Sequence, residues 1–129
     1  MVTYEDVIQN EEVKEFIQNA QKQLDVLGYT EHSTRHCSLV AERAAYILRT
    51  LGYDEHRIEL ARIAGYMHDI GNSINRVDHA HTGAILAYNI LKEMGMNVFR
   101  AVVSIDDFIY FVESCNEELN SHYSIRKVA

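Results

Sequence analysis

Histidines and one adjacent aspartate stand where an amphipathic helix would place apolar residues. The segment GYMHDIGNSINRVDHAHTG contains the pair His68 and Asp69 and, about ten residues later, His79 and His81. Another histidine, His36, precedes a helical run of apolar residues earlier in the chain. Imidazole and carboxylate ligands together suit Zn, Mn, Fe or Ni better than they suit Ca or Mg. These residue types therefore point to a divalent transition-metal site.

Helical periodicity directs three of the histidines toward the core. At about 3.6 residues per turn, His36, His68 and His79 each continue an apolar stripe. Asp69 is turned by about 100° from His68, and His81 falls nearer the edge of its apolar face. A single inward histidine is most simply a hydrogen-bonded core residue. For three of them together with Asp69, spacing alone supports a metal site and a hydrogen-bonded core about equally. The stripes are Val40, Ala44, Ile47 and Leu51 for His36, then Ala61, Ala64 and Gly65 for His68, then Gly83, Leu86 and Ile90 for His79.

Composition predicts one soluble domain that contains these residues. The chain has 129 residues, of which 47% are hydrophobic, enough for a single domain with a core. Its 12 basic and 19 acidic residues give a net charge of −7, which argues against binding a nucleic-acid polymer or an anionic membrane. No apolar run nears the roughly 18 residues of a membrane span, and no signal-peptide pattern opens the chain. We expect a cytoplasmic protein, and its oligomeric state stays open.

Glycines and capping residues divide the chain into about five expected helices. Thr3 can cap the first helix and Gly28 can end it, while Asp54 can cap the third. The two cysteines lack paired spacing, so reduced core thiols are favoured over a disulfide. No alternating strand, repeat or linker is present, which predicts a single all-α domain over residues 1–129. The expected helices cover about 3–28, 33–51, 54–71, 79–95 and 97–115, with a polar turn at 72–78 and a frayed tail at 116–129.

Three segments resemble the HD-domain metal-dependent phosphohydrolases of the His-Asp-Ile-Gly type. They are RHCSLVAERAAYIL, ARIAGYMHDIG and HAHTGAILAYNIL, and the resemblance covers roughly residues 30–95. It implies a compact helical domain that holds one or two divalent ions (Mn, Fe, Zn or Ni). It also implies hydrolysis of a phosphomonoester or phosphodiester, with a phosphorylated small molecule such as a nucleotide as substrate.

The resemblance assigns roles to individual residues. His36, His68 and Asp69 match the metal ligands, and the pair His68 and Asp69 matches the catalytic motif. His79, four residues before a Gly-Ala pair, matches a histidine that binds a second metal or the phosphate. With the phosphate we also associate Asn72 and Arg76. A contact between His81 and substrate is the remaining candidate role, with a plain surface histidine as the alternative.

Two departures from the family pattern leave a second interpretation open. Many members have lysine after the glycine of the motif, where this chain has Asn72. The family also closes its site with a later aspartate, and here the candidates are Asp106 and Asp107. Asp106 lies nearer the inner face of the expected last helix, so we take it as the metal ligand. The alternative is a short or truncated, degenerate HD domain that binds metal or nucleotide as a regulatory module without turnover.

Overall fold

The regular structure of the chain is helical wherever the structure describes it. The computed structural model describes residues 2–28 and 34–97. Over these two ranges it has five α-helices, one 3-10 helix and no strand, which confirms the all-α prediction. None of these helices is long and apolar enough to cross a membrane. The elements are α1 (Tyr4–Gln9), α2 (Glu11–Val26), α3 (Thr34–Thr50), α4 (Glu55–Met67), η1 (Ile70–Ser73) and α5 (His79–Glu93).

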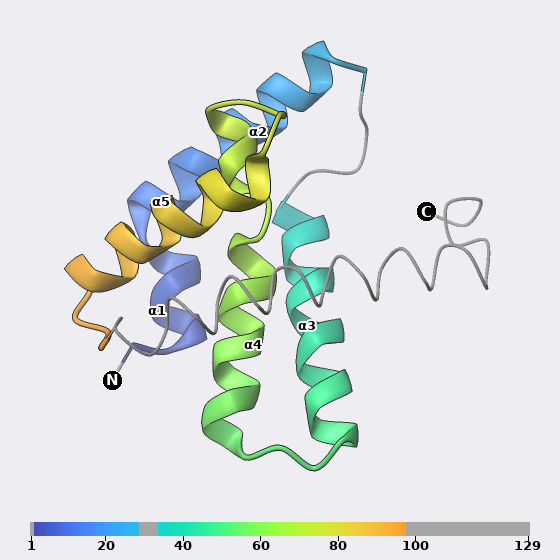
Figure 1. Ribbon diagram of the computed structural model, residues 1–129, viewed down its shortest axis with the longest axis vertical. Coiled ribbons are helices and arrows are strands. Elements are labelled where there is room, and N and C mark those ends of the chain that lie inside the picture. Colours follow the sequence, from blue (N-terminus) through green and yellow to red (C-terminus); the bar gives the residue numbers. More distant parts are fainter. Residues whose placement is uncertain (1, 29–33, 98–129) are drawn as a thin grey trace.

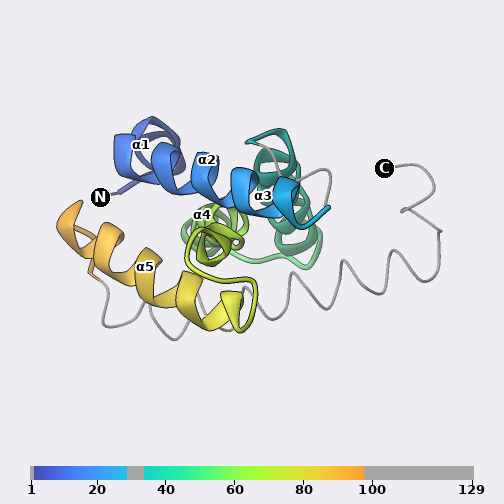
Figure 2. The ribbon, with the colours of Figure 1, turned by 90° about the horizontal axis from the view of Figure 1, so that it is seen from above.

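Helices α3 and α4 pack against each other as an antiparallel hairpin (Figure 1). Seen from above, α2 and α5 lie on opposite sides of α4 (Figure 2). The short helix η1, which follows α4, contacts both α2 and α5. The last turn of α4 is therefore placed where the start of α3, the start of α5 and η1 come together.

The prediction of one continuous helix over residues 3–28 is wrong, because the structure has two helices there, separated at Asn10. This residue has an extended backbone, with φ −69° and ψ 126°, and its side chain accepts a hydrogen bond from the Val13 amide at 3.0 Å. Asparagine favours this capping arrangement over a helix interior because its side chain competes for backbone donors. Helix α1 is thereby turned onto α4, where the Tyr4 amide donates to Glu59 Oε2 at 3.2 Å.

The buried side chains form two clusters. The main cluster draws on α1, α2, the start of α3, the end of α4, η1 and α5, and it includes Val7, Ile17, Met67, Ile70 and Leu91. The distal cluster lies between α3 and α4, away from His36, His68 and His79. Its members are Val40, Ala44, Ala45, Leu48, Ile58 and Ala61.

Other boundaries and one stripe also differ from the prediction. Helix α4 ends at Met67 and not near Gly71, because Asp69 leaves the helical conformation at φ −104° and ψ 3°. Leu51 was expected in the core but is 63% exposed, since α3 ends at Thr50 and its buried stripe passes through Leu48. The expected helix at 97–115 and the tail at 116–129 lie outside the described residues, apart from Asn97.

Candidate metal centre

His68 is oriented by the end of its own helix. The last carbonyls of an α-helix have no amide partner within the helix, and a nearby histidine can satisfy one of them. Here His68 Nδ1 lies 2.7 Å from the carbonyl oxygen of Gly65, three residues earlier. A carbonyl only accepts, so Nδ1 carries the proton and Nε2 of the neutral ring keeps its lone pair. That Nε2 lies 3.2 Å from Asp69 Oδ2.

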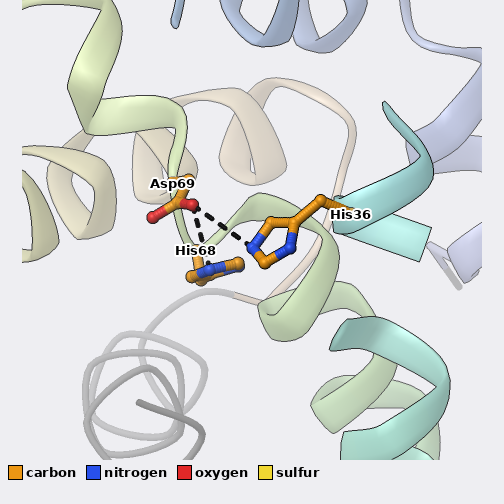
Figure 3. A group of neighbouring side chains, drawn as sticks. All are labelled: His36, His68 and Asp69. Atoms are coloured by element: carbon orange, nitrogen blue, oxygen red, sulfur yellow. Dashed lines mark ion pairs between the residues drawn. The ribbon is translucent and has the colours of Figure 1, made fainter. Parts of the chain in front are cut away.

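His36 reaches the same carboxylate from α3. Its Nε2 lies 3.7 Å from Asp69 Oδ2, and its ring centroid is 5.4 Å from that of His68. Figure 3 shows the His36, His68 and Asp69 side chains turned toward one another from the two helices. The approach depends on Gly65, because a Cβ there would lie 2.9 Å from Ala41 Cα. The two helices therefore approach each other closely beside their two histidines.

His79 completes the group from the first turn of α5. Its Nε2 lies 3.5 Å from Asp69 Oδ1, while its Nδ1 lies 3.1 Å from the carbonyl oxygen of Arg76. Gly71 allows α5 to come this near, because a Cβ at that position would overlap the carbonyl oxygen of His79. Asp69 thus presents one oxygen to two histidines and the other oxygen to a third.

The donor set fits a divalent metal ion. Asp69 is 8% exposed, and one ligand atom from each of His36, His68 and Asp69 lies within 4.8 Å of the others. A carboxylate oxygen and an imidazole lone pair are both acceptors, so they stabilise each other only through a shared proton or cation. Ligands held at about 2.0–2.2 Å from one ion lie roughly 3.0–3.6 Å apart. The separations of 3.2 and 3.7 Å to Asp69 Oδ2 are close to that range.

Asn72 and Arg76 support the group from the segment that begins with η1. Asn72 is 1% exposed, and its Nδ2 donates to the Asp69 carbonyl oxygen at 3.0 Å. Arg76 Nη1 donates to Asn72 Oδ1 at 3.2 Å. A guanidinium is therefore held two hydrogen bonds from the backbone of the carboxylate residue. The structure brings both residues beside the centre.

Of the remaining predicted site residues, His81 lies away from this group and Asp106 is not among the described residues. His81 is on the surface of α5, with its side chain 72% exposed and its Nδ1 3.8 Å from Asp78 Oδ1. Asp106, the predicted closing ligand, and its neighbour Asp107 lie outside the described residues. Their roles remain predictions.

The interior beside the centre opposes additional negative charge. Burial, and then the charge of Asp69, raises the pKa of the Cys37 thiol to about 12. Burial likewise raises the pKa of Tyr66 to about 12, with Cys37 a smaller cause. Cys37 is a free, buried thiol, and its raised pKa favours the protonated form, which is a weaker nucleophile than the thiolate.

The carbonyls that orient the histidines were missed by the sequence analysis. Gly65 and Arg76 each lie three residues before the histidine that they orient. Such partners hold the ring and fix which nitrogen is protonated, and losing them typically weakens metal binding 10- to 100-fold. The spacing of three residues was the available signal, but it becomes informative only once the ends of the helices are known.

Comparisons with known proteins agree with this geometry. The sequence model of a family described as HD domain matches residues 34–122. An uncharacterized protein of Methanocaldococcus jannaschii is 28% identical over 106 residues, which are 70% of this chain and 41% of that protein. A second uncharacterized protein of that organism is 34% identical over 79 residues, covering 58% of this chain and 44% of the relative. The chain thus spans less than half the length of these curated relatives, and no solved structure matches it.

Proposed function

The chain belongs to the HD domain family, and we propose on this premise that it is a metal-dependent phosphohydrolase. The observation that carries the proposal is the convergence of three imidazole Nε2 atoms on one buried carboxylate, at 3.7, 3.2 and 3.5 Å. The family match includes every residue of this group. A purely structural core would seldom bury so many polar groups at helix ends.

His36, His68 and Asp69 would hold the first ion, which we propose is Mn, Fe, Zn or Ni. His79, on the second oxygen of Asp69, would hold a second ion or a phosphate oxygen. Asp106 remains our candidate for a further ligand. A bound divalent ion supplies Lewis-acid chemistry, because it makes water a stronger nucleophile and withdraws charge from a phosphoryl oxygen.

The side chains of the chain would position the reacting groups. Asp69 would orient the attacking water and accept its proton as the new bond to phosphorus forms and the bond from phosphorus to the alcohol oxygen breaks; the alcohol would leave after taking a proton from solvent. Arg76, held by Asn72, would offset the charge that builds up on the phosphoryl oxygens. The substrate would be a small phosphomonoester or phosphodiester, with a nucleotide as one candidate, and His81 would touch it only if the substrate extends over α5.

The decisive experiment measures bound metal and phosphoester hydrolysis on the same preparations. Elemental analysis should detect bound metal in the wild type. With added Mn, the wild type should also hydrolyse p-nitrophenyl phosphate. Asp69→Ala should lose metal and at least about 100-fold in turnover, with its helical circular dichroism retained. Asp25→Ala, an exposed aspartate on α2, is the matched control and should behave as wild type. Wild-type turnover in Asp69→Ala would show that the assigned role is wrong.

Two further variants separate an enzyme from a degenerate domain. Asp106→Asn should lower metal affinity and turnover far more than Asp107→Asn, if the inner aspartate closes the site. A wild type that binds metal but hydrolyses no phosphoester would instead support a regulatory module. Equal, near-neutral effects of the two variants would mean that neither aspartate is a ligand, and this incomplete site would favour the degenerate domain.

A further inference from the structure

A pocket of about 580 Å³ lies between the C-terminal end of α2 and the segment after η1. Its volume is within the range of small-molecule sites, which is roughly 300–1,000 Å³. Leu24, Val26 and Leu27 line it from α2. Ile74 and Val77 line it from the opposite segment. Aliphatic side chains therefore face one another across a concave surface.

Four of these five aliphatic side chains, all except Leu24, are unusually exposed. Val26 is 85% exposed, Leu27 58%, Ile74 61% and Val77 77%. Single exposed apolar residues are common on protein surfaces, but several around one hollow mark a place where an apolar ligand or partner binds. The pocket thus offers apolar contact area that the described part of the chain does not cover.

The same pocket borders two residues that support the metal centre. Arg76 and Asn72 also line it, and Asn72 is hydrogen-bonded to the Asp69 backbone at 3.0 Å. The Arg76 carbonyl orients His79, at 3.1 Å. Part of the pocket lining therefore comes from residues that support the centre, and it includes a guanidinium in a chain with a net charge of −7. A ligand with an anionic end and an apolar body matches this distribution.

We propose that this pocket binds the apolar body of the phosphoester, so that the protein selects phosphates of hydrophobic alcohols over phosphates of polar ones. The inference rests on the proposed function and adds the substrate class. The phosphate would be directed to Arg76 and the metal centre, and the alcohol would lie against Val26, Ile74 and Val77. Each buried methylene contributes about fourfold to affinity, so a short alkyl chain suffices for a clear preference.

Selectivity is measured as phosphate release from hexyl phosphate and from glycerol 3-phosphate with added Mn. The ratio of the two kcat/KM values should be at least about tenfold in favour of hexyl phosphate for the wild type. Val77→Asp and Val26→Asp should bring the ratio near one, because the charge opposes apolar contact. Ile85→Asp, on α5 and 63% exposed, lies outside the pocket and should keep the wild-type ratio. A ratio unaffected by the two pocket variants would overturn the proposal.

A binding measurement tests the pocket without any turnover. The fluorescent probe 8-anilinonaphthalene-1-sulfonate combines an aromatic body with an anion, and it should bind at one site and be displaced by hexyl phosphate. Val77→Asp and Val26→Asp should each weaken probe binding at least tenfold, while Ile85→Asp should not. If the probe binds in the pocket but the protein hydrolyses no phosphoester, the proposed pocket stands and the proposed phosphohydrolase activity is wrong. If the protein hydrolyses phosphoesters but the pocket variants do not change probe binding, the phosphohydrolase activity stands and the proposed role of the pocket is wrong.

Discussion

The two ends of the α3–α4 hairpin differ in the kinds of side chain that they bury and expose. At the site end, polar side chains are buried: His68 is 5% exposed and Asp69 8%. At the distal end, near the turn between the helices, apolar side chains reach solvent: Leu51 is 63% exposed and Tyr53 44%. The same two helices therefore bury polar groups at one end and expose apolar groups at the other.

The difference separates the residues that stabilise the fold from those that provide the chemistry. The distal cluster contains only apolar side chains, and burying them removes hydrocarbon from water at about 25 cal/mol per Å². Burial of Asp69 and the histidines costs free energy unless a cation or proton is shared among them. We therefore expect distal substitutions to reduce stability without affecting metal binding, and site-end substitutions to affect metal binding.

Truncating Leu48 should give the largest loss of stability at the distal end. Its side chain is 4% exposed within the distal cluster, so Leu48→Ala should lower the free energy of unfolding by about 2–4 kcal/mol. Urea denaturation monitored by circular dichroism measures this loss. Metal affinity of the folded protein should stay at the wild-type value.

Leu51→Ala is the matched control for this measurement. Three residues further along, Leu51 is largely in solvent, so its truncation should change stability by no more than about 0.5 kcal/mol. Equal losses for the two variants would mean that the turn packs against something beyond the described residues. A loss of metal affinity in Leu48→Ala would mean that the two ends are coupled.

The leucine pair also shows where sequence reasoning about the fold succeeds and fails. Val40 and Ala44 were placed in the core correctly, because a helical stripe follows from spacing alone. Leu51 was placed wrongly, since which part of the stripe is buried depends on where the helix ends and where its partner lies. Asn10 was missed for a related reason, because a side chain that can cap a helix breaks an otherwise continuous pattern.

The sequence predicts the candidate metal ligands but not the backbone carbonyls that orient the histidines. His36, His68 and Asp69 carry their chemistry in the residue type, and the structure brings them together. The roles of the Gly65 and Arg76 carbonyls depend on backbone position, which residue type does not encode. The pocket beside Arg76 needs α2 and the segment after η1 to be adjacent, and no local pattern contains that information.

The same substitution, glycine to alanine, can be made at both ends of the hairpin, at Gly65 and at Gly52, to compare the two ends. At the site end, Gly65→Ala would force a Cβ to 2.9 Å from Ala41 Cα and move the carbonyl that orients His68. We expect a loss of about 1–3 kcal/mol in unfolding free energy and metal binding weakened roughly 10-fold or more. Isothermal titration with Mn measures the second effect.

At the distal end, a Cβ on Gly52 would meet no atom within 4 Å, but φ is +83° there. Gly52→Ala should therefore cost about 1–2 kcal/mol through backbone strain, with metal affinity unchanged. Identical metal affinities in the two glycine variants would show that close helix approach does not position His36 and His68.

The smallest predicted effect concerns pH and Cys37. The pKa of this thiol is raised from 9.0 to about 12 in the folded protein, first by burial and then by the charge of Asp69. Between these values the unfolded chain releases a proton that the folded protein retains, so unfolding becomes easier as pH rises. The thiol's full contribution to stability is present below pH 9 and is lost progressively toward pH 12. Between pH 9 and pH 10 it should fall by about 1 kcal/mol.

Urea unfolding of wild type and Cys37→Ala at both pH values isolates this contribution from that of the tyrosines. The variant should lose less stability than the wild type over the interval, by about the same 1 kcal/mol. Asp69→Asn should lower the pKa of Cys37, because the second cause of its shift is removed. The Asp69→Asn variant should then show faster thiol alkylation than the protein that retains Asp69, with both measured in a Cys115→Ser background that leaves one cysteine. Equal pH dependence with and without Cys37 would show that solvent reaches the site end as freely as it reaches the distal turn.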